Sequence, residues 1–209
     1  MCAVALFGLG LAFAAAGFVA ACAPSASPSA APSGVTAAGS PLGGAGARLA
    51  AVLGKLASGY SFTSTVSVGG QVATQATGRW IGGASEFTVT TNGVSITYRT
   101  LPPRSWVLQA GKGWVEVNGS VPGGSPLDAL KLPNQASVVK QTGDTLELTA
   151  SYPAAVLGLA GSAPLAVDLV LASDGSLSAT YTAPTGSATS ATTIKPDPGQ
   201  APIAAPSPS

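Results

Sequence analysis

One segment of the chain places its apolar residues at helical spacing. They recur at intervals of three and four positions and so share one face of a helix. These residues are Leu49, Val52, Leu53 and Leu56. Gly59 follows directly and suits the end of a helix, because glycine readily adopts the left-handed backbone that closes one. We therefore predict one long helix near the start of a folded domain, with a leucine-rich face that packs against a sheet.

After this helix the pattern changes to an alternation of apolar and polar residues, which indicates strands with one buried face. In the stretch 60–68, Tyr60 and Phe62 begin an apolar row that alternates with serine and threonine. Turn signals follow, and Asn92-Gly93 is the strongest short hairpin signal among them. The strands expected in this first meander are 60–68, 71–81, one around Phe87 and Val89, 94–99, 105–110 and 114–118.

The second half repeats the alternation after a break rich in glycine and proline at 119–126. We predict short helical pieces near 127–131 and within 153–159. The expected strands are 137–141, 145–150, 165–171, 177–181 and 189–194. The fold class is therefore α+β, with one long helix and short extra helices on a large, strongly curved antiparallel sheet. So many strands must curl or split, and a helix in the hollow of a curled sheet either fills it or roofs a cavity.

A different apolar pattern occupies the N-terminus, where residues 3–21 are almost all Ala, Leu, Phe, Val and Gly. The run closes with Val19-Ala20-Ala21-Cys22, and small residues before a cysteine resemble a bacterial lipobox. In that motif the thiol of Cys22 receives a diacylglycerol and a peptidase cuts before it. Residues 1–21 are then a lipoprotein signal peptide, and two acyl chains give a stable anchor. We expect a protein held by lipid at the outer face of the cell membrane.

The apolar run has an alternative interpretation. A signal peptide normally carries positive charge before its apolar core, yet the first Lys or Arg of the chain is Arg48. We expect the true start to lie upstream of Met1, in a basic leader. The alternative is an uncleaved membrane anchor, because the run approaches the roughly 20 residues that span a bilayer. Both interpretations place the domain outside the membrane.

Composition divides the remaining chain. Residues 22–46 contain only Ala, Pro, Ser, Gly and a few other uncharged residues, which predicts a disordered tether. The folded domain should span 47–195, and the proline-rich 196–209 should be a disordered tail. Charged residues make up 8% of the chain and the net charge is +1, so we expect no nucleic-acid partner. Little lysine beside abundant alanine and glycine suggests a GC-rich genome, such as an actinobacterial one.

The order of elements and several local stretches resemble a known family. The stretches are 78–80 (GRW), 96–99 (ITYR), 113–117 (GWVEV), 151–154 (SYPA) and the hairpin within 167–181. Together with the lipobox, tether and single long helix, they resemble the mycobacterial LppX/LprG-type lipoproteins, which share a fold with the LolA-type periplasmic lipoprotein carriers. The resemblance implies a half-barrel sheet closed by a helix over an apolar cavity for acyl chains. It also implies carriage of lipid or lipoprotein between envelope layers, or a scaffold for envelope assembly.

Catalytic chemistry is poorly supported by the residue types present. The chain has no histidine, which excludes a Ser-His-Asp triad and an imidazole metal ligand. Residues 137–140 fit the S-x-x-K pattern of penicillin-recognising enzymes, but they lie in a strand pattern, whereas the chemistry needs a helical turn. We expect no catalytic residue, no metal and no cofactor, and therefore no enzyme.

Aromatic and apolar residues gather in the first meander and are the candidate ligand-contacting set. They are Tyr60, Phe62, Trp80, Phe87, Ile96, Tyr98, Trp106 and Trp114. They form either an ordinary core under the helix or the wall of a lipid-accepting cavity. Two functions follow. The first is carriage of a lipid or other apolar ligand in the concave face. The second is a non-carrier envelope module with a filled core, structural or regulatory, that binds an envelope protein of unknown identity.

Overall fold

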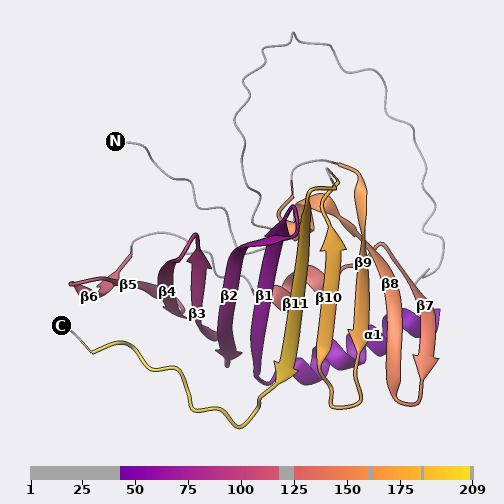
Figure 1. Ribbon diagram of the computed structural model, residues 1–209. Coiled ribbons are helices and arrows are strands. Elements are labelled where there is room, and N and C mark those ends of the chain that lie inside the picture. Colours follow the sequence, from indigo (N-terminus) through magenta and orange to yellow (C-terminus); the bar gives the residue numbers. More distant parts are fainter. Residues whose placement is uncertain (1–42, 118–124, 160–161, 185, 208–209) are drawn as a thin grey trace, which may run out of the picture.

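The computed structural model describes residues 43–117, 125–159, 162–184 and 186–207 (Figure 1). These residues form an α+β fold dominated by one large antiparallel sheet that does not close on itself. The predicted signal peptide at 1–21, the lipidation motif Val19 to Cys22, and most of the predicted tether lie outside the described residues. Their assignment stays a prediction.

Within the described residues the sheet has eleven strands in two meanders. The first meander consists of β1 (Tyr60–Val68), β2 (Gln71–Ile81), β3 (Ala84–Thr91), β4 (Val94–Leu101), β5 (Arg104–Gln109) and β6 (Gly113–Glu116). The second consists of β7 (Gln135–Thr142), β8 (Thr145–Pro153), β9 (Pro164–Leu171), β10 (Leu177–Thr182) and β11 (Ala188–Pro196). The spatial order is β6-β5-β4-β3-β2-β1-β11-β10-β9-β8-β7. The predicted strands are confirmed, with ends that shift by a few residues.

The two meanders join where the first strand pairs with the last. β1 and β11 run antiparallel, and their register sets Tyr60 opposite Pro196 and Val68 opposite Ala188. The hydroxyl of Thr192 donates to the hydroxyl of Ser64 at 2.8 Å across this seam. The first and last strands therefore lie in the middle of the sheet, and its free edges are β6 and β7.

The predicted long helix is α1 (Gly43–Leu56), which crosses one face of the second meander between β7 and β11 (Figure 1). It begins inside the predicted tether, because Ala45 is buried and continues the apolar stripe by one turn. The short helices are α2 (Pro126–Leu130) and the 3₁₀ turn η1 (Ala154–Leu157). Among the described residues, no helix has the length and apolar character needed to cross a bilayer.

The leucine face of α1 packs directly onto the sheet. Leu49, Leu53 and Leu56 are buried in one cluster with apolar residues of four strands. These partners are Leu146, Leu148 and Ala150 on β8, Leu165, Val167, Leu169 and Leu171 on β9, Leu177 and Ala179 on β10, and Ile194 on β11. Strand β9 alternates exposed and buried residues along its whole length, as a strand with one buried face must.

Buried hydroxyl groups tie α2 to the sheet. The Ser125 hydroxyl accepts from the backbone N–H of Leu127 at 3.2 Å, which caps the helix. The same hydroxyl lies 2.7 Å from the hydroxyl of Tyr60. The hydroxyl of Tyr152 donates to the carbonyl of Leu130 at 3.1 Å. Both ends of α2 are thus tied to buried tyrosines of the sheet.

The prediction of a disordered tail at 196–209 is wrong for residues 197–207, which follow the lower ends of the first-meander strands (Figure 1). The backbone N–H of Asp197 donates to the carbonyl of Gly59 at 2.9 Å. The side-chain amide of Gln200 donates to the carbonyls of Tyr60 and Trp80 at 3.3 and 3.1 Å. The domain therefore extends past its predicted end at 195.

Candidate functional site

The eight residues predicted to line a cavity lie on two opposite faces of the sheet. Direct partners in an antiparallel pair project to the same side. Tyr98 on β4 pairs with Val107, whereas Trp106 pairs with Arg99 on the opposite face. Trp114 projects with Trp106. The predicted set therefore cannot line one cavity. Six members share the face that carries α1, namely Tyr60, Phe62, Trp80, Phe87, Ile96 and Tyr98.

On the α1 face the aromatic rings fill the space between strands. Phe87 and Tyr98 stack with ring centres 5.1 Å apart, and both are buried with Phe62 in the main core cluster. Gly78 makes this packing possible. A Cβ at that position would lie 2.4 Å from the Cβ of Phe87 and 2.9 Å from Cε1 of Phe62. The ring of Phe62 thus occupies the room that a side chain at position 78 would take, as expected of a filled core.

Trp80 and Ile96, on the same face, differ in burial. Trp80 is partly buried against the same core cluster. Ile96 is exposed, beside Val94 near the tip of the β3–β4 hairpin, and Val94 exposes 64% of its surface. The α1 face is therefore filled at its centre and leaves a small apolar strip open at this tip.

Two open hollows flank α1. One, of about 290 Å³, is bordered by Gly46, Leu49, Ala50, Leu53, Leu130, Lys131 and Pro133. The other, of about 390 Å³, lies where α1 meets the ends of β7 to β9 and has charged residues on its rim, among them Arg48, Lys55 and Asp144. Both are lined by residues of α1, and the first includes Leu49 and Leu53 of its leucine face. The first has the apolar lining that an acyl chain would need.

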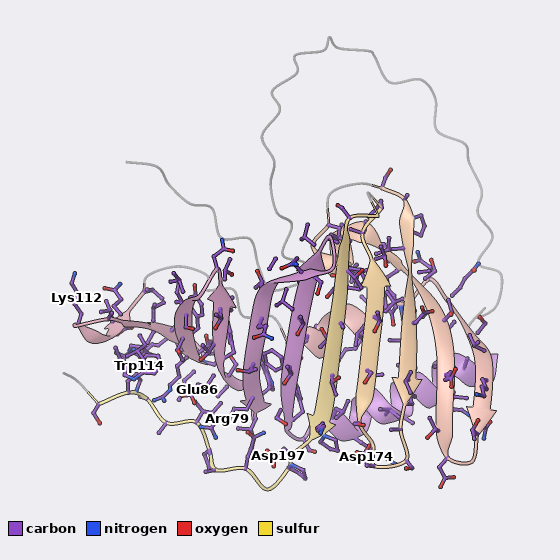
Figure 2. The ribbon with its side chains drawn as sticks, viewed as in Figure 1. Arg79, Glu86, Lys112, Trp114, Asp174 and Asp197 are labelled. Atoms are coloured by element: carbon purple, nitrogen blue, oxygen red, sulfur yellow. The ribbon has the colours of Figure 1, made fainter. Side chains whose placement is uncertain are left out.

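The opposite, hydroxyl-rich face carries a row of charges at the lower ends of its strands. Arg79 on β2, Glu86 on β3 and Arg99 on β4 are direct cross-strand partners. The Nε of Arg99 donates to Oε2 of Glu86 at 2.6 Å, and Nη2 of Arg79 lies 3.6 Å from Oε1 of the same carboxylate. One carboxylate thus pairs with two guanidinium groups across three strands, and Figure 2 labels Arg79 and Glu86 of this row.

The row continues onto two tryptophans, each covered by a guanidinium group. The Arg99 guanidinium carbon lies 4.5 Å from the ring centre of Trp114, and that of Arg104 lies 5.0 Å from Trp106. Arg104 also donates through Nε to Glu116 at 2.8 Å. This hydrogen bond lowers the pKa of the Glu116 carboxyl below its ordinary value. Stacking and ion pairing fix both indole rings and leave the guanidinium edges able to donate further hydrogen bonds.

The C-terminal segment lies in this row. Nη1 of Arg79 donates to the carbonyl of Ala201 at 3.0 Å, and Nη1 of Arg99 donates to the carbonyl of Ala204 at 3.1 Å. Between them Ile203 is buried, with 6% of its surface exposed. Figure 2 shows Arg79, Glu86 and Trp114 along the path of the segment.

Beyond Ala204 the segment borders a hollow of about 400 Å³. Its lining is Arg104, Trp106, Trp114 and Glu116 on the sheet and Ala205, Pro206 and Ser207 on the segment. We call this surface the arginine–tryptophan groove. It consists of Arg79, Glu86, Arg99, Arg104, Trp106, Trp114 and Glu116. It offers guanidinium groups that donate hydrogen bonds to main-chain carbonyls and flat aromatic surface, which suits binding rather than bond breaking.

One sequence signal bears on this groove, the Asn92-Gly93 turn; it predicted a hairpin, but the charge pair that the hairpin sets was not predicted. Asn92-Gly93 is the centre of the β3–β4 hairpin, so its register sets Glu86 opposite Arg99. The part played by residues 197–207 had no such signal. Among the described residues, no cluster of three or more His, Cys, Asp or Glu side chains is arranged to hold a metal ion. Comparison of the chain with models of known protein families and with curated proteins finds no match.

Proposed function

We propose that the protein is a membrane-anchored extracytoplasmic lipoprotein whose domain acts through its outer surface. In this proposal the domain is a non-enzymatic module that binds another envelope component. The motif that ends in Cys22 supports the anchor. The burial of Leu49, Leu53 and Leu56 in one cluster with the sheet supports a surface module over a carrier, because the described apolar side chains of helix and sheet pack against one another.

Lipid carriage in the concave face of a half-barrel, as the LppX/LprG resemblance implies, is the second candidate. One observation favours it. The hollow between α1 and α2 is apolar and bordered by Leu49, Leu53 and Leu130. Its volume of about 290 Å³ lies at the small end of the range for ligand pockets, so any ligand held there would have one short chain rather than several.

The anchor is tested by Cys22→Ser in the full chain. We expect the variant to leave the membrane fraction or to remain at the size of the uncut precursor, because serine lacks the thiol that receives the diacylglycerol. Fractionation and mass spectrometry of the N-terminus measure both outcomes. Ala23→Ser is the matched control and should stay on the membrane. Unchanged size and membrane retention of Cys22→Ser would instead favour an uncleaved membrane anchor.

The choice between surface module and carrier is tested by lipid extraction. The Cys22→Ser protein is purified from the cells and medium of the culture that makes it, and its bound lipids are analysed by mass spectrometry. We expect no lipid in stoichiometric amount. The variant Ala50→Trp, which would block the hollow between α1 and α2, is the control. A lipid that co-purifies with the parent and is lost from Ala50→Trp would establish the carrier and overturn the surface module.

A further inference from the structure

We propose that the arginine–tryptophan groove is a binding site for extended Ala/Pro-rich polypeptide segments, and that residues 201–207 are its built-in occupant. The inference rests on the proposed function, since it names the chemistry of the partner that the surface module binds. The partner is another polypeptide chain in an extended, proline-rich conformation.

The spacing of the groove matches the repeat of such a chain. Arg79 and Arg99 lie on β2 and β4, two strand spacings apart, and neighbouring strands are about 4.8 Å from one another. Their separation across the sheet is therefore about 9.6 Å. A polyproline II chain repeats every three residues and rises about 9.3 Å in that interval. The two arginines accordingly bond to carbonyls three residues apart, those of Ala201 and Ala204.

The next repeat of the chain falls on the tryptophans. One further interval of three residues leads from Ala204 to Ser207, which lies with Pro206 at the hollow beside Trp106 and Trp114. Flat aromatic surfaces are the usual contact for proline rings in grooves that bind polyproline II segments. The hollow of about 400 Å³ leaves space that the segment does not fill, so a longer or bulkier occupant fits there.

The recognition is through the main chain and therefore tolerant of sequence. Both arginines bond to backbone carbonyls, and proline keeps its carbonyl although it lacks an N–H. A proline-rich chain also loses little conformational entropy on binding, because its extended form is already populated when free. Ile203 is buried, so this is the position of the segment at which the groove recognises a side chain.

Because residues 201–207 already occupy the groove, any partner must compete with them for binding. A segment joined by a short flexible linker competes at an effective concentration in the millimolar range. If the isolated segment binds at about 100 μM, the attached copy should weaken the binding of an added copy by about tenfold. A partner must therefore bind more tightly than residues 201–207 or be present at high local concentration.

The experiment uses the full chain with Cys22→Ser and a fluorescein-labelled synthetic peptide of residues 198–209. A second protein also carries Ile203→Asp, which places a charge at the buried position and releases the attached segment. We expect the peptide to bind the Ile203→Asp protein about tenfold more tightly than the parent, measured by fluorescence anisotropy. A Gly/Ser peptide of the same length, which lacks proline rings and stays flexible when free, is the control and should bind both proteins much more weakly.

Groove variants locate the binding. In the Ile203→Asp protein, Arg99→Gln and Trp114→Ala should each weaken peptide binding at least fivefold. Arg48→Gln, far from the groove and bonded to Gln141, should leave it unchanged. Should Ile203→Asp lower the melting temperature strongly, Gln200→Ala replaces it, because Gln200 fastens the start of the segment.

Two outcomes would overturn the inference. One is the absence of peptide binding to a folded protein whose segment is released, which would make residues 201–207 a fixed cover of the sheet. The other is binding that Arg99→Gln and Trp114→Ala leave unchanged. Neither outcome bears on the proposed function itself, which stands or falls on membrane retention and lipid content.

Discussion

Gly78→Ala should destabilise the domain by about 2 kcal/mol, within the range measured when extra carbon is forced into a packed core. The new Cβ would lie 2.4 Å from the Cβ of Phe87 and 2.7 Å from the carbonyl oxygen of Glu86. The second contact is with backbone, so β2 and β3 must separate rather than one side chain turning aside. Urea denaturation followed by circular dichroism measures the change in the free energy of unfolding.

Gly54→Ala is the matched control and should have the opposite sign. Gly54 lies inside α1, is exposed, and has open space around a Cβ at its position. Alanine is favoured over glycine in a helix interior by about 1 kcal/mol, so this variant should be more stable than the parent. A neutral Gly78→Ala beside a stabilising Gly54→Ala would contradict the close packing of Phe62 over β2.

Alkaline pH should unfold the domain steeply between about pH 10 and 12. Burial raises the pKa of the Tyr181 hydroxyl to about 12, and it raises the pKa of Tyr60 and Tyr152 further. In the unfolded chain a tyrosine ionises near pH 10. The stability from these raised pKa values is therefore fully present below pH 10 and is lost as pH rises through the folded-state values.

The loss is large because three tyrosines act together. Each shifted group removes about 1.4 kcal/mol per pH unit while only its unfolded form ionises. Three such groups remove about 4 kcal/mol per unit, and a typical domain has about 5 to 15 kcal/mol in total. Two pH units above 10 should therefore approach or exceed the stability of the domain.

Tyrosinate absorbance and far-ultraviolet circular dichroism recorded on one sample measure the effect. We expect both signals to change together above pH 10. Tyr181→Phe, which keeps the ring and removes one ionising group, should make the transition shallower. Absorbance that rises near pH 10 while the dichroism stays constant would show tyrosines that ionise in the folded state and would contradict their burial.

The strands and much of the core could be predicted because local signals agreed with one another, whereas the central pairing of β1 with β11 was not predicted. The alternation in 60–68 predicted which residues of β1 are buried, and Asn92-Gly93 fixed the register of β3 and β4. That register alone places Phe87 opposite Tyr98 and Glu86 opposite Arg99. The helix was predicted from its leucines, and Ala45 extended the same stripe.

The face of the two tryptophans was not readable for a physical reason. In β5, Trp106, Val107 and Leu108 are consecutive apolar residues, so both faces of the strand carry apolar side chains. The sequence of β5 therefore does not alternate, and it does not indicate which face of this strand is buried in the core. The pairing of Arg99 with Trp106 depends on the turn after β4, whose geometry the sequence did not specify.

The C-terminal segment was misjudged because its contacts use groups that every residue has. Ala201 and Ala204 are held through their carbonyls by Arg79 and Arg99. The identity of an alanine or proline side chain gives no sign that its carbonyl is hydrogen-bonded. A segment of this composition cannot fold by itself, and the prediction of a disordered tail followed from that composition. The information lies in the spacing of two arginines on the sheet, which only the strand register reveals.

Because β1 pairs with β11, the sheet cannot be completed until the last strand has been synthesised. Ser64 and Thr192 are 128 positions apart in the chain, so the central seam closes only after a large loop has been ordered. During synthesis the first meander exposes an unpaired edge on β1 until the last strand is made, and such an edge is a template for association with other chains. A nonsense mutation between residues 183 and 188 would remove β11 alone among the strands and leave two half-sheets, each with a long open edge. The domain is therefore complete only when its final strand arrives.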